Sequence, residues 1–263
     1  MAPPLGGKSV SSACSQVKPR LAGFFYAVTI AAGLFAEVGV RSAFRGTNAL
    51  SVTGNETFYR VAEIADVVML CCYLAVTTLL YELFRPAGRQ LSLLAAAFSM
   101  MGIAVLAGNG LLHMAPLALV KGMEEGPICA DGCKIVITTL LDLHGTVYGI
   151  SLIFFGIYCV VIGWLIVRSR AMPPLVGIAM MIGGAAHLIT KFVGLVEPDL
   201  AFPRLVNTLP LLAEAMLALW LLVFGMRRPF QITPPRADET SPAHCPSLLP
   251  QSARKRRQRS PAP

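Results

Sequence analysis

Long apolar segments recur along the chain at a length suited to crossing a membrane. A bilayer core of about 30 Å needs about 20 mainly apolar residues per helix, and six segments reach this length with few charges. Pro, Gly and charged residues separate each segment from the next. The pattern predicts an all-α polytopic membrane helix bundle, with crossings at 21–40, 61–84, 91–120, 144–167, 175–196 and 205–225.

Three of these segments have features that predict how they lie. The runs 91–120 and 135–167 are longer than one crossing needs, which indicates tilt or helical extension beyond the bilayer core. The first turns of the run 135–167 are expected at the interface. Pro116 is expected to bend or end the third helix. Small residues such as Gly183 and Gly184 let helix backbones approach closely, so the fifth helix is expected in the bundle centre.

The two ends of the chain differ from the apolar domain between them, 21–225. Residues 1–20 are rich in Gly, Pro, Ser and Lys and predict a disordered leader, while 226–263 predict a disordered, basic, Pro-rich tail. A cleaved signal peptide is the alternative for the first apolar run. That run exceeds the usual apolar length of a signal, contains Glu37 and lacks a clear small-x-small cleavage site, which favours an uncleaved anchor.

The composition is that of a protein surrounded mainly by lipid. The distribution of charged residues along the chain predicts how the bundle is oriented in the membrane. The chain is 55% hydrophobic and 14% charged, with a net charge of +8. The leader, the second and fourth loops and the tail together hold 15 of 22 basic residues and three acids, against seven basic residues and eleven acids elsewhere. This bias predicts that both termini are cytoplasmic. The run 254–257 is then expected to bind anionic lipid headgroups and not nucleic acid.

The cysteines do not predict a zinc ribbon. Seven are spread over tail, helices and loops, with no C-x-x-C pair. Cys129 and Cys133 fall in a predicted outer loop, where a disulfide is chemically permitted. Two free thiols fit the same spacing equally well.

Ionisable and amide residues within the crossings are the candidates for function. A charge inside a bilayer costs about 2.5–3.5 kcal/mol on insertion scales, so such residues are expected to face the bundle interior. Helical spacing places several of them on shared faces: Glu37 with Arg41, Arg60 with Glu63 and Asp66, Asn109 with His113, His187 with Lys191, and Asn207 with Glu214. Asp142 and His144 are two residues apart and point to different faces.

These positions all fall in the predicted outer halves of their helices, which predicts one polar pocket open to the outside. His187, Glu214 and Asn109 are expected at its deepest level. The expected ligand-binding residues are Glu37, Arg41, Arg60, Glu63, Asp66, Asn109, His113, Asp142, His144, His187 and Glu214.

Three other interpretations of these residues stay open. The ion pairs could serve only to fix helix packing. His113, His144 and His187 in one layer could bind zinc or a haem iron, although no cofactor is predicted, since neither H-E-x-x-H nor paired histidines on one helix occur. Lys191 near Glu214 could form a proton-coupled pair.

Four groups of residues form a pattern that extends over several helices. They are Glu37-Val38-Gly39-Val40-Arg41; Tyr59-Arg60 with Asp66 and Leu83-Phe84-Arg85-Pro86; Leu140 to Gly145 with Phe154-Phe155-Gly156; and Glu214 with Leu219-Trp220-Leu221-Leu222. This pattern, over about 20–225, resembles the DUF4386 family of bacterial integral membrane proteins. The resemblance implies a multi-pass bundle in the bacterial cytoplasmic membrane and no established activity. Ala186-His187 and Lys191 depart from the pattern.

The sequence leaves three functions open. The first is binding or transport of a small solute, ion or proton, with His144 and His187 as exchangeable proton carriers. The second is an intramembrane metal-dependent hydrolase or lipid-modifying enzyme. The third is a structural or regulatory membrane subunit. No internal repeat and no nucleotide-binding loop is found in the sequence, which argues against secondary transport of the repeat type and against ATP-driven work by this chain alone.

Overall fold

The fold consists of long helices that follow one another along the chain. The computed structural model describes residues 7–41, 56–124, 130–197, 200 and 202–226, without the side chains of 7–15 and 122–134. All described helices lie in one compact unit, Met1–Phe230. They are α1 (Gly7–Leu34), the π-helix η1 (Phe35–Arg41), α4 (Glu56–Phe84), α5 (Arg89–Glu124), α6 (Ala130–Ser169), α7 (Pro174–Val196) and α8 (Arg204–Val223).

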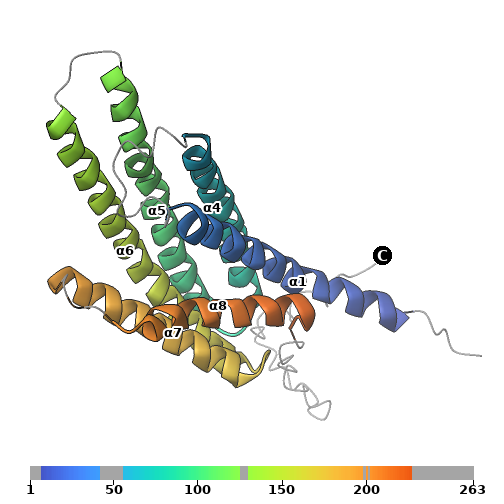
Figure 1. The fold of residues 1–263 in the computed structure, drawn as a ribbon. Coiled ribbons are helices and arrows are strands. Elements are labelled where there is room, and N and C mark those ends of the chain that lie inside the picture. Colours follow the sequence, from blue (N-terminus) through green and yellow to red (C-terminus); the bar gives the residue numbers. More distant parts are fainter. Residues whose placement is uncertain (1–6, 42–55, 125–129, 198–199, 201, 227–263) are drawn as a thin grey trace, which may run out of the picture. The chain divides into compact units, whose positions relative to one another are not determined.

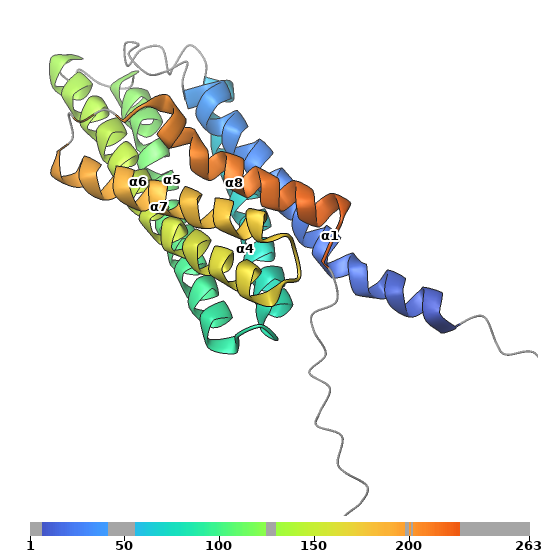
Figure 2. The ribbon, with the colours of Figure 1, turned by 90° about the horizontal axis from the view of Figure 1, so that it is seen from below.

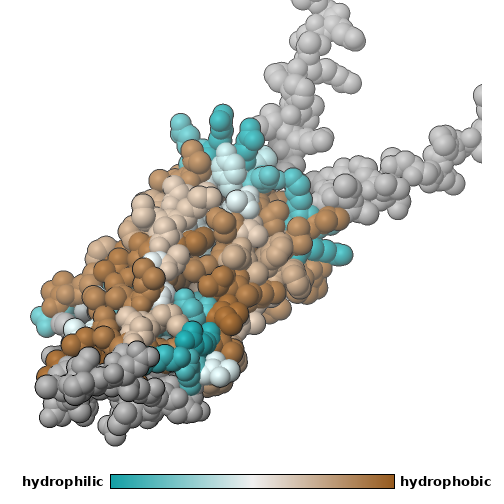
Figure 3. Space-filling view, turned by 90° about the horizontal axis from the view of Figure 1, so that it is seen from above, coloured by the Kyte–Doolittle hydropathy of each residue, from teal (hydrophilic) through white to brown (hydrophobic). Residues whose placement is uncertain are grey.

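The prediction of a six-helix integral membrane protein is confirmed. Among the described residues, six helical segments are long and apolar enough to cross a bilayer: Gln16–Arg41, Glu56–Phe84, Arg89–Lys121, Ile135–Ser169, Pro174–Val196 and Arg204–Val223. Large apolar side chains remain exposed on them, among them Leu111, Leu175 and Val196. Hydrophobic residues cover most of the face in Figure 3, and hydrophilic residues gather toward its two ends. Such a surface suits lipid and not water.

The helices form a closed ring in chain order. Each helix packs on the next, from α1 to α4, α5, α6, α7 and α8, and α8 returns to α1 (Figures 1 and 2). The Gln16 side chain joins the two terminal helices: its Nε2 donates to the Met226 carbonyl at 2.7 Å, and its Oε1 accepts from the Met226 N–H at 3.2 Å. These hydrogen bonds therefore join the first span to the end of the last one.

Small residues set the closest helix contacts. A Cβ added at Gly163 of α6 would lie 2.5 Å from the Gly177 carbonyl oxygen of α7, and one at Gly184 of α7 would lie 2.6 Å from that of Gly156. Gly183 faces the other way, toward α8. The expectation of close backbone approach is confirmed, but α7 is not central. Its glycines lie on two faces and wedge it between α6 and α8, and α6 has the most buried span.

Two helix limits differ from the sequence-based prediction, and a third feature agrees with it. Helix α1 begins at Gly7, within the segment predicted as leader, and passes through Pro19 without a break. Helix α5 continues past Pro116 to Glu124, so Pro116 does not end it. Helix α6 is continuous over 40 residues, which agrees with the predicted extension of the run 135–167 beyond one crossing. The end of α5 is stabilised by packing, since Leu117 is buried against Tyr59 of α4.

For the site, two ends of the bundle are distinguished. The Arg41 end contains Arg41 of η1, the start of α4, the end of α5 and the start of α6. The Arg85 end is the opposite one, with the loop after Phe84. The predicted tail from 227, the run 254–257 and Cys129 lie outside the described residues, as does the Cys133 side chain.

Candidate functional site

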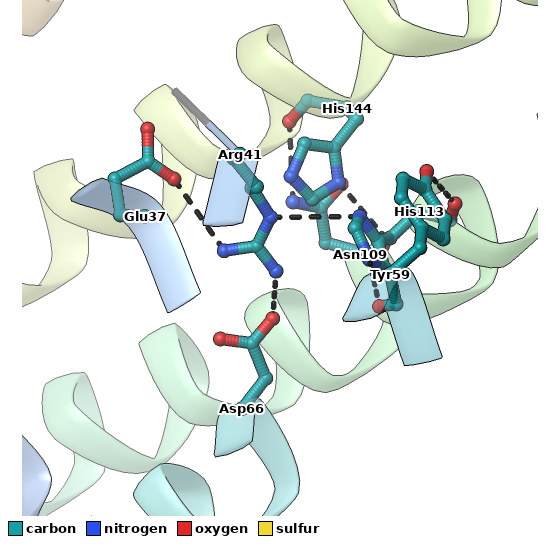
Figure 4. Close-up of polar contacts among 7 residues, drawn as sticks. All are labelled: Glu37, Arg41, Tyr59, Asp66, Asn109, His113 and His144. Carbon is teal, nitrogen blue, oxygen red and sulfur yellow. Dashed lines mark hydrogen bonds and ion pairs between the residues drawn. The ribbon is translucent and has the colours of Figure 1, made fainter. Parts of the chain in front are cut away.

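Arg41 is the centre of a polar network at the Arg41 end (Figure 4). It closes the π-helix η1, and only 9% of the residue is exposed. Its Nη2 pairs closely with the Asp66 carboxylate of α4, and its Nη1 lies 3.4 Å from the Glu37 carboxylate. Its Nε donates to His113 Nδ1 of α5 at 3.5 Å. All three guanidinium nitrogens are therefore engaged within the protein.

Tyr59 and His113 connect α4 to α5 through two reciprocal hydrogen bonds. The Tyr59 hydroxyl donates to the His113 carbonyl oxygen, and His113 Nε2 lies 3.4 Å from the Tyr59 carbonyl oxygen. Their rings stack with centroids 4.1 Å apart. Because Arg41 can only donate, His113 Nδ1 must accept, and the ring proton belongs on Nε2, where it meets the carbonyl. This arrangement uses both nitrogens of a neutral imidazole.

Asn109 and His144 connect α5 to α6 in the same reciprocal way. Asn109 Nδ2 donates to the His144 carbonyl oxygen at 3.1 Å, and His144 Nδ1 lies 3.3 Å from the Asn109 carbonyl oxygen. The contact with a carbonyl fixes which way the amide points, since the opposite orientation would place two oxygens together. The Asn109 Oδ1 atom is therefore directed away from that contact.

A cavity of about 260 Å³ lies beside this network. Its polar lining comes from η1, α4, α5 and α6, and a wall of apolar side chains completes it. A water molecule occupies about 30 Å³ in the liquid, so the cavity has the size of a small solute. The lining residues are Arg41, Glu63, Asp66, Val67, Leu70, Cys71, Leu106, Ala107, Asn109, Gly110, His144 and Tyr148.

Two acceptor atoms of cavity-lining residues are left without partners. Glu63 Oε2 and Asn109 Oδ1 are buried and have no hydrogen-bond partner among the described residues. Only 1% of Asn109 is exposed. The Glu63 carboxylate lies directly against Gly110 of α5, where a Cβ would collide with it. Gly110 thus makes the space that the carboxylate occupies.

Seven of the eleven predicted site residues come together here: Glu37, Arg41, Glu63, Asp66, Asn109, His113 and His144. Arg60 does not join them. It is exposed and pairs with Glu56 at 2.7 Å, and Glu56 also binds Lys121 at 2.7 Å. Asp142 is exposed too.

His187 and Glu214 are not in this cavity, which corrects the expectation of a single pocket with these residues at its deepest level. The His187 Cβ faces Gly156, and Glu214 Oε1 accepts from the Cys159 thiol at 3.4 Å. Both α6 positions are far from His144 along the helix, about 18 and 22 Å at 1.5 Å per residue. Glu214 belongs instead to the bundle core.

The three histidines accordingly do not share one layer. His113 and His144 have ring centroids 5.6 Å apart, while His187 lies on α7. Across the described part of the chain, no three side chains of the His, Cys, Asp and Glu types are grouped so that they could hold a metal ion. The interpretation as a zinc or haem site therefore gains no support from the geometry.

Sequence reasoning assigned no site role to Tyr59, Gly110, Cys71 and Tyr148. A signal existed for two of them. Tyr59 lies four residues before Glu63 and seven before Asp66, which puts all three on one helix face. Tyr148 follows His144 by four residues. Nothing in the sequence marked Gly110, since its importance comes from a neighbour on another helix.

The chain belongs to the DUF4386 family, a domain of unknown function whose model matches residues 21–225. The match covers the six spans apart from the first residues of the first one. The resemblance noted in the sequence is thereby confirmed. No curated protein and no solved structure matches the chain.

Proposed function

We propose that this integral membrane protein binds a small solute in the cavity beside Arg41. The observation that carries the proposal is the cavity itself, about 260 Å³ with a polar wall that hydrogen bonds hold in place. Small-molecule sites are typically concave and largely preformed, with a few placed polar groups on an apolar lining. Polar residues within membrane spans commonly mark such sites.

The main alternative to solute binding is that the polar network serves only to fix helix packing. Such a network would pair its buried polar atoms internally, because unpaired ones are costly in a low-dielectric interior. Arg41, His113 and Tyr59 fit that description. Glu63 and Asn109 do not, since each lines the cavity and has a buried oxygen without a partner among the described residues. A solute in the cavity would explain both groups of residues.

The test is a thermal-shift screen of detergent-purified protein against small amines, alcohols, carboxylates and sugars. Ala107 lines the cavity and is exposed on α5, so Ala107→Leu fills space with little cost to the core. Ala104→Leu is the matched control, exposed on the same helix and outside the lining. We expect saturable stabilisation by at least one solute class, lost in the first variant and kept in the second. A wild-type protein that responds to none, or an equal response in Ala107→Leu, would contradict the proposal.

Orientation belongs to the same proposal. The charge bias supports cytoplasmic termini, and with them a cavity nearer the outer face of a bacterial cytoplasmic membrane. The solute would then reach the site from outside the cell.

A further inference from the structure

We infer that the ligand of this cavity is a small organic cation that donates N–H hydrogen bonds, such as a protonated alkylamine. The inference rests on the proposed function and adds the chemical class of the solute. It depends on which groups at the cavity are satisfied and which are not.

Every donor nitrogen of Arg41 and Asn109 already has an acceptor within the protein. Each nitrogen of the Arg41 guanidinium has a protein acceptor: Asp66, Glu37 or His113. Asn109 Nδ2 donates to a carbonyl oxygen. A carboxylate ligand would have to compete with Asp66 and Glu37 for the Arg41 guanidinium.

Two acceptors, in contrast, have no partner. Glu63 Oε2 and Asn109 Oδ1 both belong to lining residues, are buried, and lack a partner among the described residues. Buried acceptors without a partner are rare in native structures, and each calls for a partner such as a water, an ion or a donor group of a ligand. A ligand with two or more N–H groups can satisfy both.

Charge favours the same class. The lining holds one guanidinium, of Arg41, and two carboxylates, of Glu63 and Asp66. Since Asp66 pairs with Arg41, Glu63 supplies an excess negative charge. A desolvated carboxylate is costly without a counter-charge, and a monovalent cation provides one.

The remaining lining explains why the cation is organic. Val67, Leu70 and Leu106 are apolar and contribute to the lining. A short alkyl chain can pack on these side chains while the ammonium group meets Glu63 and Asn109. The volume of about 260 Å³ accommodates a small amine of this kind.

The test compares four probes of similar size on the purified full-length protein, by calorimetric titration: butylammonium, tetramethylammonium, 1-butanol and butyrate. We expect saturable binding of butylammonium, at least tenfold tighter than the other three. Tetramethylammonium keeps the charge but has no N–H group, so equal binding would overturn the role of donors. Equal binding of butanol or butyrate would overturn the role of charge.

Two variants localise the effect. Glu63→Gln keeps the shape and removes the charge, and we expect it to weaken butylammonium at least tenfold. Asp142→Asn, an exposed carboxylate on α6, is the control and should leave binding unchanged. If Glu63→Gln binds butylammonium as tightly as the wild type and Asp142→Asn do, the inference is overturned.

The outcomes separate the inference from the proposed function. If butyrate or butanol binds and Ala107→Leu abolishes the binding, the cavity is a solute site and the cation is wrong. If no probe binds and the wider screen also fails, both the cation and the solute site are wrong.

Discussion

At the residue scale, Arg41 is the group on which the Arg41-end network depends. A guanidinium is charged at all accessible pH values, so its burial in a membrane span requires compensation. Asp66 and Glu37 supply the charge, and His113 takes the remaining nitrogen. Because these partners come from η1, α4 and α5, Arg41 ties three segments together.

We expect Arg41→Gln to destabilise the protein by about 3 kcal/mol, the scale for breaking a buried ion pair. The cause is the uncompensated charge left on Asp66. The double variant Arg41→Gln/Asp66→Asn should recover much of the loss. Thermal unfolding in detergent measures both. Arg60→Gln is the control, since that exposed arginine pairs only with Glu56 among the described residues. A double variant as unstable as the single one would show that the pair itself is not the cause.

Gly110 gives a second prediction, with Gly108 as its matched control. A Cβ at Gly110 would meet the Glu63 carboxylate, whereas one at Gly108 would meet nothing within 4 Å. Gly110→Ala should displace Glu63 and weaken butylammonium binding severalfold or more. Gly108→Ala should leave binding intact and raise stability by up to about 1 kcal/mol, as Gly to Ala does within helices. Equal affinities in the two variants would show that Glu63 does not bind the ligand from its present position.

The start of α4 shows how far sequence could define the site. Spacing of three suggested Arg60, Glu63 and Asp66 as one stripe, and two of these residues do line the cavity. The third member of the inward face is Tyr59 instead. A period of three and a period of 3.6 diverge within two turns, and charge alone could not decide between a tyrosine and an arginine.

At the element scale, α7 depends on glycine contacts to both neighbours. A Cβ added at Gly184 would lie 2.6 Å from the Gly156 carbonyl oxygen and 2.9 Å from the Val160 nitrogen. These are backbone atoms of a packed helix, so they cannot move aside as a flexible side chain can.

We therefore expect Gly184→Ala to lower stability by about 1–3 kcal/mol, the usual cost of overpacking. Gly194→Ala on the same helix is the control, because a Cβ there meets nothing within 4 Å. Melting temperatures of the two variants should differ by several degrees. If both variants melt alike, the α6–α7 contact is looser than these distances imply.

Which segments form the spans was predictable from sequence. The level at which residues of different helices meet was not. Apolar length and the Pro, Gly and charged residues between the segments defined the spans well. The levels at which Glu214 and His187 meet α6 depend on tilt and on which faces pack, and neither is encoded in one segment. Glu214 is consequently opposite Cys159 and not near Asn109.

At the scale of the whole molecule, ring closure and charge act on different aspects of the structure. The contact between α1 and α8 fixes the neighbours of each helix, and it is made by apolar packing together with the Gln16 and Met226 bonds. Such contacts are the same whichever way the bundle is inserted. Orientation must therefore come from the flanking charges, which differ by side.

The final prediction concerns the orientation of the helix bundle in the membrane, and with it the side from which the cavity is reached. The Arg85 end and the termini together hold 15 of the 22 basic residues, so this side should stay in the cytoplasm. In a bacterial host, a fluorescent protein fused after Pro263 should fluoresce, and alkaline phosphatase at that position should be inactive. The same reporters inserted between Glu125 and Cys129 should behave in the opposite way. If the pattern is reversed, the cavity would be reached from the cytoplasm. The chemical class of the ligand would then be unaffected, because it depends on the lining and not on the insertion.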